Sequence, residues 1–167
     1  MCGILVSISK VKFSESILKK TTQALQHRGP DKNGYHRALI NGLHYNFIHT
    51  RLSIRGLGKE GDQPIFSKCG RYLLCFNGEI YNSNSLMTRL SVKLKKDISD
   101  TVVLLNLLIE KGSNIIKHLE GMFAFVFCDL KTGNIITSRD TVGVKPLYKY
   151  QKNDVLIYSS KQSVKDV

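Results

Sequence analysis

The second residue of the chain is a cysteine, which follows the initiator methionine and precedes a short apolar run in MCGILVSI. Taken alone, Cys2 is most simply interpreted as a small packing residue near a chain end, because many free cysteines are inert and apolar in behaviour. The alternative depends on removal of Met1. The trimmed chain would carry a free α-amine and a thiol on one residue, so that the base and the nucleophile would belong to the same residue.

The other three cysteines lack this setting. Cys69, Cys75 and Cys128 form no CxxC pair and have no histidine-rich partner segment, so the sequence gives little support for a zinc site. Cys75 and Cys128 lie within apolar runs, where we expect buried and inert thiols. Cys2 is therefore the cysteine that the sequence selects for chemistry.

Two polar stretches could complete a site with Cys2. In NGEIYN, at 77–82, Asn77 and Gly78 follow the strand-like RYLLCF. They predict either a turn, since both residues tolerate positive φ, or two hydrogen-bond donors that stabilise an oxyanion. Arg51, in HTRLSI, is either a solvated charge at a strand end or a residue whose guanidinium binds a carboxylate through two N–H donors.

Asp100 has a similar ambiguity. It precedes a long apolar segment, so Ser99 or Asp100 is first of all a helix N-cap. As a ligand, the Asp100 carboxylate would pair with an ammonium group. An arginine, an aspartate and two donors together describe a site for an α-amino acid whose side-chain carbonyl is attacked.

The elements that must position these residues form two groups of strands, with helices before and between them. The patterns predict helices over 14–27, with Ser14 as N-cap, and over 83–90, 101–112 and 113–119. Pro30 should stop the first helix. Strands are predicted over 3–9, 35–40, 43–52, 71–77, 121–130, 135–139, 147–150 and 155–159. This order favours an α+β domain with two stacked, mainly antiparallel sheets covered by helices.

Length and charge narrow the class of protein. A chain of 167 residues is long enough for one hydrophobic core. Its net charge of +12 comes mostly from scattered lysines rather than from arginine-rich runs, so we expect no specific nucleic-acid binding, and an acidic partner surface is as plausible. No run approaches the roughly 20 apolar residues of a membrane span, and no secretory signal is recognisable, so we expect a cytoplasmic protein without membrane attachment.

The chemistry-bearing stretches also occur in the order of a known family. They are MCGI at the start, HRGPD at 27–31, RLSI at 51–54, QP at 63–64, NGEIYN at 77–82, SDT at 99–101, EGMFAFVFCD at 120–129 and SRDTVGVKPLY at 138–148. In order and spacing they resemble the glutaminase domain of asparagine synthetases, a class II glutamine amidotransferase with the N-terminal-nucleophile (Ntn) hydrolase fold. The resemblance implies one such domain over residues 1–167, folded as a four-layer αββα sandwich.

The resemblance also assigns roles to residues. It implies that Cys2, once Met1 is removed, is the nucleophile, and that Asn77 and Gly78 form the oxyanion hole. Arg51 would hold the carboxylate of glutamine, and Glu79 with Asp100 would hold its α-ammonium group. The backbone around Leu52 and Ile54 would line the same pocket.

The implied activity is hydrolysis of glutamine to glutamate and ammonia, and it needs no metal or cofactor. ATP and Mg²⁺ would belong only to a synthetase domain, which we expect to be absent because the chain has no glycine-rich phosphate loop. The implied partners are glutamine, a separate synthetase domain or subunit, and a second copy in a homodimer. Val102 and Arg55 depart from the usual pattern, and we expect both to lie beside the pocket.

Three hypotheses of function stay open at this point. The first is a working glutaminase that supplies ammonia to an amide-forming synthetase part. The second is a catalytically idle module of the same fold with a regulatory or interaction role. The third is a nucleic-acid-binding or purely structural protein. The presence of Cys2, Arg51, Asn77, Gly78 and Asp100 together favours the first.

Overall fold

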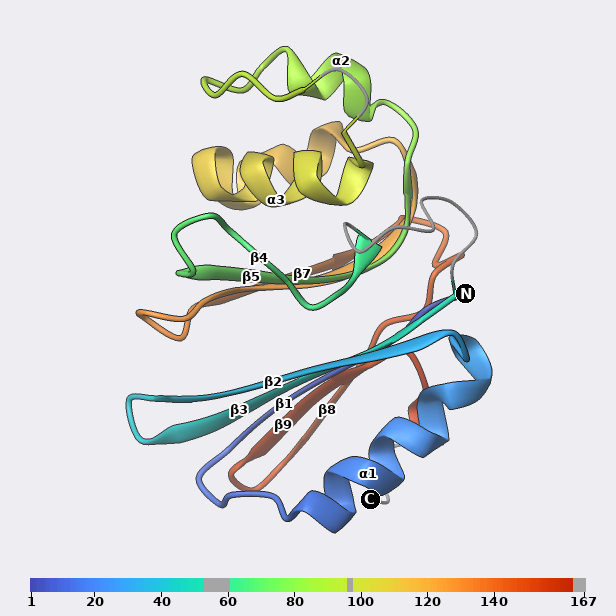
Figure 1. The fold of residues 1–167 in the computed structure, drawn as a ribbon, viewed down its shortest axis with the longest axis vertical. Coiled ribbons are helices and arrows are strands. Elements are labelled where there is room, and N and C mark those ends of the chain that lie inside the picture. Colours follow the sequence, from blue (N-terminus) through green and yellow to red (C-terminus); the bar gives the residue numbers. More distant parts are fainter. Residues whose placement is uncertain (53–60, 96–97, 164–167) are drawn as a thin grey trace.

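Two antiparallel β-sheets are stacked face to face in the centre of the protein (Figure 1). The computed structural model describes residues 1–52, 61–95 and 98–163. One sheet has the strand order β2-β3-β1-β9-β8 and the other the order β4-β5-β6-β7. The strands are β1 (Gly3–Ser9), β2 (Lys32–Ile40), β3 (Leu43–Arg51), β4 (Ile65–Phe66), β5 (Tyr72–Ile80), β6 (Gly121–Asp129), β7 (Ile135–Arg139), β8 (Tyr148–Lys152) and β9 (Val155–Ser159).

Helices cover the outer face of each sheet (Figure 1). Helix α1 (Glu15–Leu25) lies against the five-stranded sheet, and α3 (Asp100–Lys111) lies against the four-stranded sheet, with α2 (Ser83–Met87) packed on the outer side of α3. Two 3₁₀ segments, Gln26–Arg28 and Gly112–His118, extend α1 and α3. The four layers confirm the αββα sandwich expected from the sequence.

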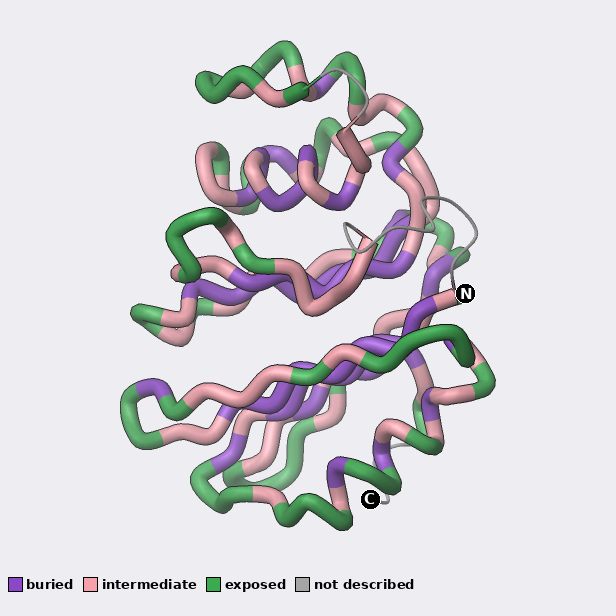
Figure 2. Tube along the Cα trace, in the orientation of Figure 1, coloured by how far each residue is buried: buried purple, intermediate pink, exposed green. Residues whose placement is uncertain are grey.

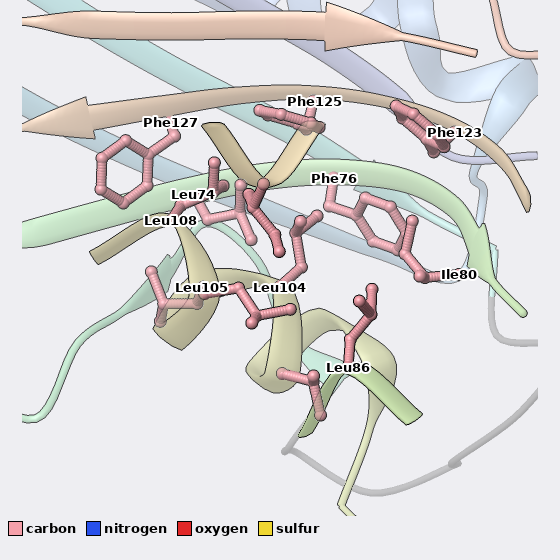
Figure 3. Close-up of a cluster of buried hydrophobic side chains, with 13 residues drawn as sticks. Leu74, Phe76, Ile80, Leu86, Leu104, Leu105, Leu108, Phe123, Phe125 and Phe127 are labelled. Carbon is pink, nitrogen blue, oxygen red and sulfur yellow. The ribbon is translucent and has the colours of Figure 1, made fainter. Parts of the chain in front are cut away.

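Three hydrophobic clusters hold the layers together. Leu74 and Phe76 of β5 pack toward the helices, whereas Leu73 and Cys75 pack toward the other sheet, as the twofold alternation of a strand requires. The cluster under α2 and α3 is drawn in Figure 3. A third cluster, around Leu25, joins α1 to its sheet. The central strands are therefore buried on both faces, and Figure 2 shows runs of buried residues along them.

Helix ends follow their local chemistry. Ser14 Oγ accepts a hydrogen bond from Ile17 N at 3.3 Å, which confirms the predicted N-cap of α1. Regular helix ends at Leu25, two residues before the predicted end at 27, because the chain tightens into a 3₁₀ turn before Gly29. The sequence allows Ser99 or Asp100 as the N-cap of α3. The structure shows that the N-cap is Ser99, whose Oγ accepts a hydrogen bond from Val102 N at 3.4 Å.

The main correction concerns β5. The strand was expected to end at residue 77, but pairing with β6 continues to Ile80, opposite Gly121. Asn77 and Gly78 therefore lie inside a paired strand and not in a turn. The short edge strand β4 was not predicted, and α2 ends at Met87 rather than at residue 90. Among the described residues, no helix is both long and apolar enough to cross a membrane.

Candidate functional site

Cys2 and Asn77 meet between the two sheets, beside the chain start marked N in Figure 1. Alternation along β5 turns Asn77 to the same face as Cys75, toward the five-stranded sheet, and alternation before β1 turns Cys2 to the face of Ile4. Asn77 Oδ1 accepts a hydrogen bond from Cys2 N at 3.0 Å. The stacking of the sheets thus joins residues 75 positions apart.

Further contacts hold Cys2 at this place. Leu52 N lies 3.5 Å from Cys2 Sγ, and the thiol is 3.9 Å from Leu52 O. Arg28 Nε donates to Cys2 O at 3.2 Å, and Ile4 N donates to Ser160 Oγ at 3.1 Å. Cys2 N is an amide nitrogen here because Met1 is attached, and it stands in for the α-amine of a trimmed chain.

The local field at the chain start disfavours a charged amine. Burial is the main cause that lowers the pKa of the Met1 amine, and the Arg28 and Lys145 charges lower it further. The Cys2 and Asp31 charges oppose that effect. This shift belongs to the amine of the untrimmed chain, and the neutral form of an amine is the form that accepts a proton.

The side-chain amide of Asn77 is only half used by Cys2. Asn77 is 3% exposed, and its Nδ2 is buried without a hydrogen-bond acceptor among the residues that the structure describes. A buried donor left without a partner costs free energy, about 1 to 3 kcal/mol, so such groups need a reason. A negative oxygen of a bound ligand would satisfy it.

Gly78 presents its backbone in the same region. Phe123, its partner on β6, donates its N–H to Asp140 Oδ2 and accepts from Asp140 N, so both groups point away from β5. In an antiparallel pair the backbone groups of the opposite residue then also point outward, so Gly78 N–H is directed away from β6, to the side of β5 on which β4 lies. The φ of Gly78 is +152°, and a Cβ there would lie 2.1 Å from Met122 O. Only glycine fits this position.

Arg51 ends β3 with its side chain 9% exposed. Its Nη1 lies 3.0 Å from Asp62 Oδ1, and the other oxygen of Asp62 pairs with Lys32. Leu52, the next residue, supplies the backbone contact to the Cys2 thiol. Ile54 and Arg55, which the sequence placed in or beside the pocket, lie outside the described residues.

Asp100 is connected to the site by a hydrogen bond to the end of β5. Asp100 Oδ2 accepts from Ile80 N at 2.9 Å, and Oδ1 accepts from Thr101 N at 2.8 Å. Burial is the main cause that raises the pKa of Asp100, the Glu79 charge raises it further, and the two backbone donors oppose the rise. A cation between these two carboxylates would relieve their repulsion. Val102 is half-buried in the first turn of α3 and donates its N–H to Ser99 Oγ.

The structure brings the predicted residues together to different degrees. Cys2, Leu52 and Asn77 are in direct contact, and Arg51 and Gly78 are their neighbours in the chain. Asp100 bonds to Ile80, which lies three positions along β5 from Asn77. The site is thus a row of residues at one edge of the sandwich, with contributions from both sheets.

Two supporting residues were not singled out from the sequence. Phe76 N donates to Gln63 Oε1 at 2.6 Å, and Phe76 O lies 3.2 Å from His49 Nε2, which must carry the proton because a carbonyl only accepts. His49 is fully buried, and burial lowers its pKa to about 4. Both residues lie within HTRLSI and QP, and the alternation of β3 could have placed His49 on the inner face with Arg51.

Comparison with known proteins gives consistent results. A family model described as glutamine amidotransferase domain matches residues 1–165. A probable glutamine-hydrolysing asparagine synthetase of Dictyostelium discoideum is 35% identical over 99% of this chain and 30% of its own length. A putative glutamine-hydrolysing asparagine synthetase of Methanocaldococcus jannaschii is 32% identical over 96% of this chain and 34% of its own length.

The fold also has a solved counterpart. The glutamine phosphoribosylpyrophosphate amidotransferase from B. subtilis matches 98% of this chain and 43% of its own chain, with a TM-score of 0.72 and 21% identity. At that identity the likeness concerns the fold alone. The chain spans about a third of the length of the curated relatives above.

Proposed function

This chain belongs to the glutamine amidotransferase domain family, and we propose that it hydrolyses glutamine to glutamate and ammonia with Cys2 as the nucleophile. The observation that carries the proposal is the position of Asn77. Its carboxamide binds the first residue of the trimmed chain through Oδ1 and keeps a buried donor, Nδ2, for a ligand oxygen. A nucleophile and an oxyanion donor are thereby held by one side chain.

The proposed reaction begins after removal of Met1. The Cys2 α-amine takes the thiol proton, directly or through a water molecule, and the thiolate attacks the side-chain carbonyl carbon of glutamine. Asn77 Nδ2 and Gly78 N stabilise the negative oxygen of the tetrahedral intermediate. The amine returns the proton to the leaving nitrogen, and ammonia departs. Water then hydrolyses the γ-glutamyl thioester, which releases glutamate and regenerates the thiol.

Recognition of the amino-acid part of glutamine is assigned to charged residues. Arg51 would bind the α-carboxylate, and Glu79 with Asp100 would bind the α-ammonium group, while the backbone of Leu52 and the neighbouring Ile54 complete the pocket. The raised pKa of Asp100 supports this assignment, because two nearby half-buried carboxylates favour a cationic ligand.

We propose that the ammonia is used by an amide-forming synthetase part. The relatives named as glutamine-hydrolysing asparagine synthetases are about three times as long as the matched region, so such a part can reside in the remainder of those proteins. Glutaminase chemistry by Cys2 needs no metal or cofactor in this domain. The proposed compartment is the cytoplasm, where the thiol that the reaction needs stays reduced.

The test is glutamine turnover by protein whose trimmed N-terminus has been confirmed by mass spectrometry. We expect release of glutamate and ammonia in equal amounts, and loss of both in Cys2→Ala and in protein that retains Met1. A glutamine-like diazoketone should label residue 2. Turnover no greater than that of Cys2→Ala would overturn the proposal, and glutamine binding without labelling would favour an idle module.

A further inference from the structure

The carboxylate-binding group assigned to glutamine already faces a carboxylate of the chain itself. Arg51 Nη1 lies 3.0 Å from Asp62 Oδ1, with the Arg51 side chain 9% exposed and that of Asp62 29% exposed. Gly61 packs against the same guanidinium, since a Cβ on it would lie 2.2 Å from Arg51 Nη2. Residues 61–62 therefore cover one edge of the Arg51 guanidinium.

Asp62 is shared between two cations. Lys32 lies directly opposite Arg51 in the register of β2 and β3, and its Nζ pairs with Asp62 Oδ2. Hydrogen bonds from Lys32 and then from Arg51 lower the pKa of Asp62, so its carboxylate stays charged at neutral pH. One anion thus bridges two positive side chains on neighbouring strands.

An incoming α-carboxylate would compete for the same donor. Two carboxylates cannot both accept closely from Nη1 without repulsion between like charges. The guanidinium offers five N–H donors in a fixed plane, so a second anion must use the other donors or displace the first from Nη1. Asp62 is itself a carboxylate, the chemical group that Arg51 is assigned to bind, and it already accepts from Nη1.

We propose that Asp62 is a built-in competitor for the α-carboxylate of glutamine and that it sets the affinity of the site. This inference rests on the proposed glutaminase function. Binding of glutamine shifts Asp62 from Arg51 toward Lys32, which keeps the displaced carboxylate neutralised. Lys32 is then a positioning residue that makes the exchange easier, although it does not touch the substrate.

The alternative is that Asp62 braces Arg51 in the orientation that binds glutamine. The two roles predict opposite signs. If Asp62 competes, Asp62→Asn lowers KM by about two- to fivefold, the range of an ion pair with one partly exposed partner, with little change in kcat. If Asp62 is a brace, the same substitution raises KM. Lys32→Gln leaves Asp62 to Arg51 alone, so competition predicts a higher KM.

A double-variant cycle tests the link. In the Asp62→Asn background, Lys32→Gln should have no further effect on KM, because its influence passes through Asp62. Glu15→Gln is the matched control, since Glu15 pairs with Arg37 at 2.6 Å on another part of the surface and should leave KM unchanged. Calorimetric titration of glutamine into the corresponding variants carrying Cys2→Ala gives the same comparison without turnover.

The outcomes separate this inference from the function on which it rests. Lower KM and tighter glutamine binding in Asp62→Asn, with the opposite change in Lys32→Gln, support competition. Unchanged or weaker binding in Asp62→Asn, in protein that turns over glutamine, overturns it and leaves the glutaminase function standing. Absence of both turnover and binding in the unsubstituted protein overturns both.

Discussion

The two ends of the candidate site are built in different ways. The proposed reacting end, formed by Cys2, Asn77 and Gly78, consists of uncharged groups fixed by backbone pairing, and Asn77 Nδ2 has no acceptor among the described residues. The proposed recognition end, formed by Arg51, Glu79 and Asp100, consists of charged groups, and Arg51 and Asp100 already have partners in Asp62, Ile80 and Thr101.

Because of this difference, we expect substitutions at the two ends to affect substrate binding and the chemical step separately. At the reacting end the Asn77 Nδ2 donor is in place before the substrate binds. Its hydrogen bond therefore stabilises the negative charge that develops in the transition state. At the recognition end the ligand must compete with or add to existing interactions, so changes there alter affinity. Substitutions at the first end should therefore lower kcat, and substitutions at the second should change KM.

The largest effect is expected at Asn77. Asn77→Ala removes an oxyanion donor and the acceptor for Cys2 N, so kcat should fall by about 10²- to 10³-fold, the usual effect of losing one such donor. Steady-state kinetics with glutamine measure kcat and KM separately. Asn106→Ala is a suitable control, because Asn106 uses its carboxamide on Val102 O in α3, away from Cys2. A rise in KM with unchanged kcat would erase the distinction between the two ends.

A buried histidine contacts β5 next to Asn77, because His49 Nε2 lies 3.2 Å from the carbonyl oxygen of Phe76. His49 has a folded-state pKa of about 4, below its ordinary value of 6.5. Its contribution to the free energy of unfolding is therefore fully present above pH 6.5 and is lost as the pH falls toward 4. The loss should reach about 2 kcal/mol at pH 5 and about 3 kcal/mol near pH 4, since each pKa unit corresponds to about 1.4 kcal/mol.

Urea unfolding at pH 7.5 and pH 5 tests this dependence. His49→Gln keeps a donor for Phe76 O and removes the titrating ring, so its free energy of unfolding should change less with pH than that of the unsubstituted protein. His118→Gln, at an exposed position, should leave the pH dependence as it was. Equal acid sensitivity in His49→Gln would show that protonation of His49 is not the cause of the acid destabilisation.

Most elements could be predicted because their signals are local. Ser14 caps α1 as expected, and the strands at 3–9 and 135–139 have the predicted bounds. The end of β5 could not be predicted, because Asn77 and Gly78 resemble a turn locally and only pairing with β6 keeps them in a strand. The two-residue strand β4 exists through its pairing with β5 and leaves no pattern of its own.

The site shows the same division between local and distant information. The stretches around Cys2, Asn77 and Arg51 could be chosen from residue chemistry and family resemblance. The pairing of Asp62 with Arg51 and Lys32 could not, because it depends on the register of β2 and β3 and on the path of the chain before Gln63. Interactions that modify a site without defining its chemistry are the ones that sequence patterns omit.

A smaller effect, confined to affinity, is expected at Asp100. Asp100→Asn removes one carboxylate from the proposed ammonium site but keeps one acceptor for Ile80 N or Thr101 N, so KM should rise by about tenfold while kcat changes little. Because the pKa of Asp100 is raised, acid should weaken glutamine binding at a higher pH than for an ordinary aspartate, and Asp100→Asn should lack that dependence. Asp154→Asn, which removes an exposed partner of Lys10, is the control. A fall in kcat at constant KM would place Asp100 with the reacting end, because it would mean that Asp100 acts on the transition state through Ile80 and β5 rather than on the bound ammonium group.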